Sequence, residues 1–234
     1  MKSSVYSKTM LIGHTELKAG DISMGGVYGE FIPNDNYFKY IQKYVWDFWT
    51  TRTPDYKIWE SLRFAVQLEN GFYLHPMGGV TFDNIREMPN EPIRIDIAGL
   101  SSQIIDDFLA NDSSRPFVEN PWVTISIEQK IAFEDELQKE IGKKGGLLSN
   151  LFKSDSKHLL TNVNCAALCK NESNDDVLFS IYDSKGSDKN FALVHLTWTA
   201  KKESNPKWPA TILYDTFDSF KYEKMYPDKT EWEY

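Results

Sequence analysis

The segment Phe191–Trp198, with the sequence FALVHLTW, decides the fold class of the C-terminal half of the chain. It is apolar at both alternating sets of positions, which is typical of a central strand covered on both faces. Leu159–Leu168, Val177–Tyr182 and Thr211–Tyr214 are predicted to be further strands, and Phe217–Met225 is predicted to be a closing helix. The C-terminal half therefore combines a small antiparallel sheet with helices.

A second helix is predicted in front of this sheet. Ser126 and Gln129 have the S-x-x-Q spacing of a capping box, and the helix behind them is expected to run to about Ile141. The glycine-rich stretch 142–146 ends it. Residues 147–158 are ambiguous, although their leucine spacing allows a short helix.

The N-terminal half begins with two predicted strands, around Met10–Ile12 and within Gly25–Ile32, where glycines mark turns or close backbone approaches. After the breaker Pro33–Asn36, apolar residues recur at steps of three and four, which predicts a helix with one wide apolar stripe. The stripe consists of Tyr37, Phe38, Ile41, Val45, Phe48 and Trp49. The helix is expected to end before Pro54.

The rest of this half alternates between strands and turns. Leu62–Glu69 and Phe72–His75 flank Asn70-Gly71, a strong hairpin signal because both residues accept a positive φ. Ile93–Ile97 is another alternating strand, and Ser102 is expected to cap a short helix that reaches Leu109.

The polar segment Asn111–Pro116 is the best domain boundary in the chain. We therefore predict two domains, 1–112 and 117–234. Each is expected to be a small α+β half with an antiparallel sheet and helices, and the two halves are expected to pack together.

Composition excludes several classes of protein. Of the 234 residues, 41% are hydrophobic, so wholesale disorder is excluded. The formal net charge of −8 argues against a general nucleic-acid binder. No apolar run approaches the ~18 residues of a membrane span, and the first residues lack the apolar core of a signal peptide. Together with only two cysteines, these features predict a cytoplasmic protein that contacts neither nucleic acid nor membrane.

No motif points to a metal, a cofactor or a catalytic nucleophile. The four histidines are far apart, and G-x-S-x-G, C-x-x-C and P-loop patterns are missing from the sequence. Cys165 and Cys169 are four residues apart in a predicted strand, where they would share one face as small buried residues. We therefore predict no catalytic, metal-binding or cofactor-binding residue.

His195 is the most suggestive single residue, because it lies inside the apolar strand. A core histidine bonded to a backbone carbonyl is the favoured interpretation. The alternative is an acid or base oriented by Asp175 or Asp176.

Acidic pairs and two tryptophans are the remaining candidates. Carboxylate clusters are either ordinary solvated surface or a surface for a basic partner, where complementary charge speeds association. Tryptophan is enriched at the energetic centres of interfaces, but the two tryptophans would equally serve to cover the sheet edge. The candidate partner-binding residues are Asp106, Asp107, Glu134, Asp135, Asp175, Asp176, Trp198 and Trp208.

Three motifs carry a resemblance. Asp175–Phe179, Phe191–Trp198 and Pro206–Pro209 resemble a group of small bacterial proteins that have a D-D-V-L-F strand, a V-H-L-T-W strand and a P-x-W-P loop. The run from Glu16 to Asn34 is similar to open reading frames that accompany polymorphic toxins of the Rhs and contact-dependent types. This resemblance implies an immunity protein that occludes a cognate toxin, and it supplies no catalytic residue.

The sequence thus leaves three functional hypotheses. The first is a toxin-neutralising immunity protein, whose partner is a protein toxin that is expected to be basic. The second is a ligand-binding or protein-binding module without a toxin. The third is an enzyme that uses His195 with Asp175 or Asp176.

Overall fold

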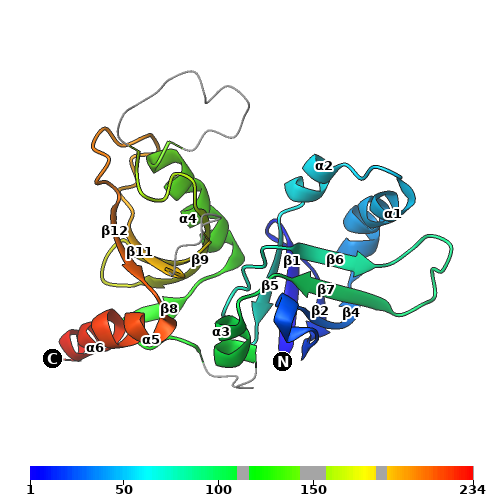
Figure 1. Ribbon diagram of the computed structural model, residues 1–234, viewed down its shortest axis with the longest axis horizontal. Helices are drawn as coiled ribbons and strands as arrows, with labels where there is room; N and C mark the ends of the chain where they lie inside the picture. The colour runs from blue at the N-terminus through cyan, green and yellow to red at the C-terminus, as the bar shows by residue number, and fades with distance from the viewer. Residues whose placement is uncertain (110–115, 143–156, 183–188, 234) are drawn as a thin grey trace. The chain divides into compact units, whose positions relative to one another are not determined.

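Two antiparallel sheets, each with its own helices, make up the fold, which is therefore α+β as the sequence predicts (Figure 1). The computed structural model describes residues 1–109, 116–142, 157–182 and 189–233. By its internal contacts the chain divides into two units, Met1–Phe117 and Val118–Tyr234, and each is described by itself. No helix among the described residues is both long enough and apolar enough to cross a lipid bilayer.

The N-terminal unit is built on a seven-stranded sheet with the order β5-β1-β2-β4-β7-β6, to which β3 adds by pairing with β4. Its strands are β1 (Lys2–Ser7), β2 (Met10–Glu16), β3 (Lys18–Ala19), β4 (Val27–Pro33), β5 (Phe64–Leu68), β6 (Gly79–Asp83) and β7 (Ile93–Ala98). Its helical segments are η1 (Ile22–Met24), η2 (Tyr37–Ile41), α1 (Gln42–Thr50), α2 (Tyr56–Ser61), α3 (Ser102–Ile104) and η3 (Ile105–Leu109).

The core of this unit is aromatic. The Phe31 ring makes edge-on contacts with Tyr37 and Phe82, with ring centroids 5.1 and 4.9 Å apart. Gly25, at φ +62°, allows the chain to pass close to Leu100, whose carbonyl oxygen would lie 2.0 Å from an added Cβ. The glycine-rich stretch is therefore a close backbone approach, as one of the sequence interpretations holds.

The predicted apolar stripe is only partly buried. Tyr37, Ile41 and Val45 are buried, but Phe38 and Trp49 are exposed. Trp49 remains at the surface because its indole Nε1 donates to the carbonyl of Phe82 on β6 at 2.6 Å. The helix therefore binds the sheet through a polar contact that hydrophobic periodicity does not reveal.

The C-terminal unit is a five-stranded antiparallel meander with the order β12-β11-β10-β9-β8. Its strands are β8 (Trp122–Thr124), β9 (Asn164–Asn171), β10 (Asp176–Tyr182), β11 (Phe191–His195) and β12 (Ala210–Tyr214). Its helical segments are α4 (Ile127–Glu140), α5 (Phe217–Phe220), η5 (Lys221–Met225) and α6 (Tyr226–Trp232).

Two sets of helices pack on this meander. Phe217 and Phe220 of α5 contact the rings of Phe191 and Tyr214, which lie opposite each other on β11 and β12. The longer helix α4 packs against β9 and begins with the predicted capping box, in which Ser126 and Gln129 bond each other's backbone amides. β11 is thus the covered strand that its apolar sequence predicts.

Several local predictions differ from the structure. Ser101, not Ser102, caps the short helix, and β9 begins at Asn164 rather than Leu159.

The expectation that Cys165 and Cys169 share one face of a strand is wrong. A bulge in β9 pairs Cys169 with Leu178 but Cys165 with Ile181, so the two cysteines lie on opposite faces. Burial raises the pKa of the Cys169 thiol well above its ordinary value, which suits a buried residue that carries no reactive thiolate. Most of the ambiguous segment 147–158 and the predicted boundary lie outside the described residues.

Candidate functional site

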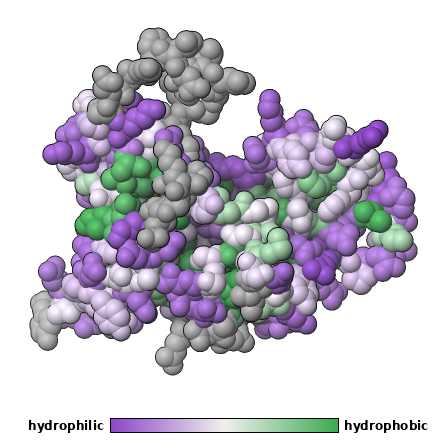
Figure 2. Space-filling model, viewed as in Figure 1, coloured by the Kyte–Doolittle hydropathy of each residue, from purple (hydrophilic) through white to green (hydrophobic). Residues whose placement is uncertain are grey.

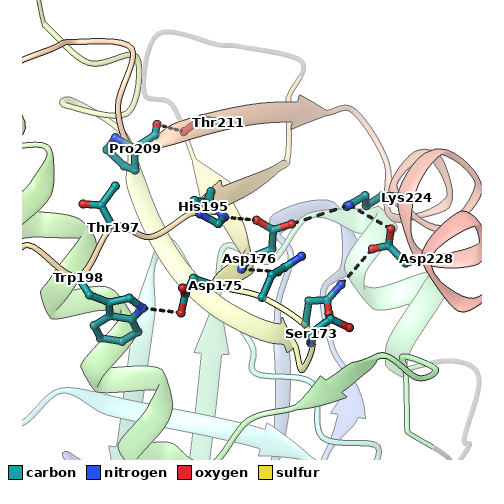
Figure 3. Close-up of polar contacts among 12 residues, drawn as sticks. Ser173, Asp175, Asp176, His195, Thr197, Trp198, Pro209, Thr211, Lys224 and Asp228 are labelled. Atoms are coloured by element: carbon teal, nitrogen blue, oxygen red, sulfur yellow. Dashed lines mark hydrogen bonds and ion pairs between the residues drawn. The ribbon is translucent and has the colours of Figure 1, made fainter. Parts of the chain in front are cut away.

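His195 and Asp176 form the centre of the candidate site, at the end of the sheet in the C-terminal unit. They lie directly opposite each other on β11 and β10, and His195 Nδ1 is 2.8 Å from Asp176 Oδ1 (Figure 3). The side chain of His195 is 43% exposed, whereas that of Asp176 is 13% exposed. The carboxylate is therefore held inside the unit while the imidazole reaches solvent.

The favoured expectation for His195, a core histidine bonded to a backbone carbonyl, is wrong. That description fits His158 instead, which is buried and whose Nε2 lies 3.0 Å from the carbonyl oxygen of Pro209. Burial lowers the pKa of His158, although the bond to Pro209 opposes this effect. His195 stays half-exposed because the strand ends there and the chain turns away.

A line of alternating charges fixes Asp176 (Figure 3). Lys224 Nζ lies 3.8 Å from Asp176 Oδ2 and 3.0 Å from Asp228 Oδ1. Asp228 Oδ2 in turn accepts hydrogen bonds from Trp122 Nε1 and Asn171 Nδ2, at 2.9 and 3.1 Å. These contacts tie η5 and α6 to the sheet, so Asp176 orients His195 and is not a freely available acid.

Trp198 has an exposed side chain, yet two contacts hold its indole and a third holds its backbone. Its indole Nε1 donates to Asp175 Oδ1 at 3.0 Å (Figure 3), and its ring centroid lies 5.8 Å from that of Phe133 on α4. Its backbone N–H donates to Glu140 Oε1 at 2.7 Å. The residue is nevertheless 46% exposed.

Two carboxylates of α4 hold the loop that carries Trp198. Glu140 Oε1 accepts hydrogen bonds from the amides of Thr197 and Trp198, and Glu136 Oε1 accepts one from Ala200 at 2.7 Å. Trp198 and Ala200 have φ of 56° and 55°, a conformation that costs free energy in residues other than glycine and needs such support. This turn is the reason that β11 ends at His195 rather than at Trp198.

Glu140 is an unusual carboxyl group because it is only 1% exposed. Its Oε2 is buried and has no hydrogen-bond partner within the described part of the chain. Burial raises the pKa of Glu140, although the amides of Trp198 and Thr197 partly oppose the shift.

Sequence reasoning did not consider Glu140, and it interpreted Glu136 only as part of a surface cluster with Glu134 and Asp135. The spacing of the two carboxylates, four residues apart and next to Phe133 and Leu137, places them on the buried face of the helix.

Trp208 completes the site. It is 42% exposed, and its ring centroid lies 6.4 Å from that of His195. Ile212 of β12 pairs with Leu193, two residues from His195 on the same face, and is 55% exposed. Figure 2 shows exposed hydrophobic surface over β12. We call the surface formed by Asp175, His195, Trp198, Trp208 and Ile212 the tryptophan corner.

The candidate partner-binding residues separate into three groups. The first group lies at the end of β10 and β11, where Asp176 and Trp208 contact His195 and Asp175 contacts Trp198. Asp106 and Asp107 are exposed on η3 of the other unit. On α4, Glu134 pairs with Lys130 and accepts the amide of Ala167, and Asp135 is half-buried, so the structure does not bring these two into the corner.

Chemically, the corner offers a half-exposed imidazole that is oriented by the Asp176 carboxylate and lies near the exposed indole of Trp208. The second exposed indole, that of Trp198, is held by the neighbouring Asp175. Nε2 of His195 has no hydrogen-bond partner in the described ranges, so it is open to solvent or to a ligand. The described residues contain no group of three or more histidine, cysteine, aspartate or glutamate side chains that is able to hold a metal ion.

The N-terminal unit has a separate surface groove of about 410 Å³. Its lining includes Lys2, Ser4, His14, Glu16, Ile32 and Glu69, so it combines charges of both signs with one exposed isoleucine. This groove is the feature that the ligand-binding hypothesis would use.

No protein-family model, curated protein or solved structure matches this chain. The function must therefore be argued from the geometry of the site.

Proposed function

We propose that this protein is a toxin-neutralising immunity protein, which binds and occludes a cognate toxin in the cytoplasm without catalysis of its own. The tryptophan corner supplies the interface. The observation that carries the proposal is that Trp198 is half-exposed and yet locked by Asp175, Phe133 and Glu140.

An exposed, immobilised tryptophan suits an interface for an energetic reason. Hot spots of protein interfaces are enriched in tryptophan, and they bind well when little side-chain entropy is lost on association. A tryptophan that served only to cover the sheet would be buried. A surface position that served only solubility would carry a polar residue instead of a tryptophan. The net charge of −8 adds long-range attraction toward a basic toxin.

The proposal predicts a toxin domain encoded by a neighbouring gene, and that domain is the probe. Expressed alone it should arrest growth of a host strain, and co-expression of this chain should restore growth. The purified proteins should form a 1:1 complex in size-exclusion chromatography with light scattering. Continued growth arrest, together with the lack of a complex between the purified proteins, would contradict the proposal.

One observation favours a second function. A histidine whose Nδ1 is held by a carboxylate and whose Nε2 is open has the geometry of a general acid or base. His195 and Asp176 meet this description. The protein would then inactivate its target by a chemical step rather than by binding.

The stoichiometry of neutralisation separates the two functions. For a binder, 0.1 molar equivalent of this chain should leave roughly 90% of the toxin activity, and neither the wild type nor His195→Gln should lower it further with longer incubation. An enzyme would remove the activity progressively at that ratio, and His195→Gln would abolish this progress. The measurement is residual toxin activity against time at several molar ratios.

A further inference from the structure

Sheet edges differ in how they are protected in this protein, and one of them is largely open as far as the described residues show. An edge strand presents unpaired N–H and C=O groups, and proteins normally cover, shorten or charge such edges. In the N-terminal unit, the β6 carbonyls of Val80 and Phe82 accept the indole N–H groups of Trp59 and Trp49. The outer edge of β5 bonds to the segment at Phe72–Leu74.

In the C-terminal unit the two edge strands are β8 and β12. β8 is only three residues long, which by itself limits pairing. β12, with the sequence ATILY, has five residues without a charge or a proline, and it pairs only with β11 among the described strands. Buried His158 lies at its start, with Nε2 3.0 Å from the carbonyl oxygen of Pro209 and 3.4 Å from Thr211 Oγ1. Beyond that point no described residue gives the strand the usual protection of an edge.

The hydrogen-bond pattern shows which residues face the open side. Leu196 N–H donates to the Asp175 carbonyl, and Ile181 N–H donates to the Asn190 carbonyl. Along an antiparallel pair of strands, every second residue directs its N–H and C=O groups toward the partner strand, and the residues between direct theirs to the other side. Because Leu196 and Asn190 bond toward β10, the main-chain groups of His195, Leu193 and Phe191 point toward β12.

The partners of these residues on β12 are Ala210, Ile212 and Tyr214. The residues between them, Thr211 and Leu213, must then direct their main-chain groups away from β11. Each offers one N–H and one C=O. Neither residue forms a main-chain hydrogen bond to any described residue at this edge.

Resting on the proposed function, we infer that the open edge of β12 receives an extended strand of the toxin, which adds to the sheet as a sixth strand. This strand would bond to Thr211 and Leu213, and its apolar side chains would contact Ile212. Such strand addition is a recurrent mode of recognition, in which main-chain bonds give affinity and alternate side chains give specificity.

Two observations favour the toxin over a second copy of this chain. The edge is continuous with the tryptophan corner, because Trp208 lies two residues before β12 and Ala210 pairs with His195. Each copy also carries a net charge of −8, so two copies repel each other whereas a basic toxin is attracted.

The test removes the outward-facing N–H of Leu213. Proline is tolerated in edge strands where the N–H faces solvent, so Leu213→Pro should fold and should weaken binding of the toxin domain by about tenfold or more. Leu213→Ala is the matched control, because it removes the same side chain but keeps the N–H; its affinity should stay within about threefold. Affinities are measured by calorimetry with the full-length chain.

A second measurement does not depend on the fold of a variant. In the wild-type complex, hydrogen exchange of the Thr211 and Leu213 amides should slow relative to the free protein. Unchanged exchange, or equal binding by Leu213→Pro while Trp198→Ala binds weakly, overturns the strand-addition mode and leaves the proposed function standing. A wild-type dimer that dissociates in Leu213→Pro assigns the edge to a second copy and also overturns it. If the wild-type chain does not bind the toxin domain at all, both proposals fail.

Discussion

Trp198→Ala is expected to weaken binding to the cognate toxin by about 100-fold. Truncation of a tryptophan at the centre of an interface costs about 2–4 kcal/mol, and 1.4 kcal/mol corresponds to a factor of ten in affinity. The effect should be large here because the indole is already held by Asp175 and Phe133, so the wild type loses little entropy on binding. Calorimetric titration of the toxin domain into each variant measures the change.

Trp232→Ala is the matched control, because Trp232 lies on α6 and is 51% exposed, against 46% for Trp198. It should bind as the wild type does. Trp198→Phe keeps an aromatic ring but removes the indole donor to Asp175, and we expect an intermediate loss. An affinity of Trp198→Ala within threefold of the wild type would remove Trp198 from the interface.

Glu140→Ala is expected to destabilise the C-terminal unit by about 3 kcal/mol. The substitution leaves the amides of Thr197 and Trp198 without their acceptor, and each buried unpaired donor costs about 1–3 kcal/mol. Denaturant unfolding monitored by tryptophan fluorescence measures the loss. Glu140→Gln retains an oxygen acceptor and should lose much less.

The same residue predicts a dependence of stability on pH. Burial raises the folded-state pKa of Glu140 above its ordinary value of 4.5. Its contribution to stability is therefore fully present below pH 4.5 and is lost as the pH rises through the folded-state pKa. As the pH rises from 4.5 through the folded-state pKa, the unfolding free energy of the wild type should fall relative to that of Glu140→Gln. Parallel curves for the two proteins would show that Glu140 does not titrate in this way.

Much of the architecture follows from periodicity. The apolar runs at Val177–Tyr182 and Thr211–Tyr214 match β10 and β12 to within one residue, the run at Phe191–Trp198 contains β11, and the capping box begins α4 where expected. These signals are local, and burial on one or both faces of a sheet reinforces them. The α+β class is accordingly predictable from the sequence.

Elements held together by polar contacts were not predictable. β1 contains the buried serines Ser3 and Ser7, and Ser7 Oγ donates to the carbonyl of Leu62 at 2.8 Å. Because serines take buried positions in this strand, its sequence shows no hydrophobic alternation from which the strand could be predicted. Trp49 likewise stays at the surface because its indole bonds a β6 carbonyl.

The site itself was partly predictable. Trp198, Trp208 and Asp175 stand out by residue type, but their convergence depends on the turn after β11. In that turn Trp198 and Ala200 have positive φ although neither is glycine. The turn is held by the carboxylates of Glu140 and Glu136, about 60 residues earlier in the chain, which accept the amides of these two residues. A bond between residues so far apart in the sequence leaves no local pattern, so neither the turn nor the end of the strand at His195 could be anticipated.

The most direct test of the tryptophan corner is a fluorine NMR spectrum of the protein labelled with 5-fluorotryptophan, recorded with and without the toxin domain. The seven tryptophans are Trp46, Trp49, Trp59, Trp122, Trp198, Trp208 and Trp232, and single Trp→Phe variants assign their signals. Binding at the corner should shift or broaden the signals of Trp198 and Trp208 and leave those of Trp46, Trp49 and Trp59 unchanged. A complex in which only the N-terminal tryptophans or Trp232 respond would contradict the account.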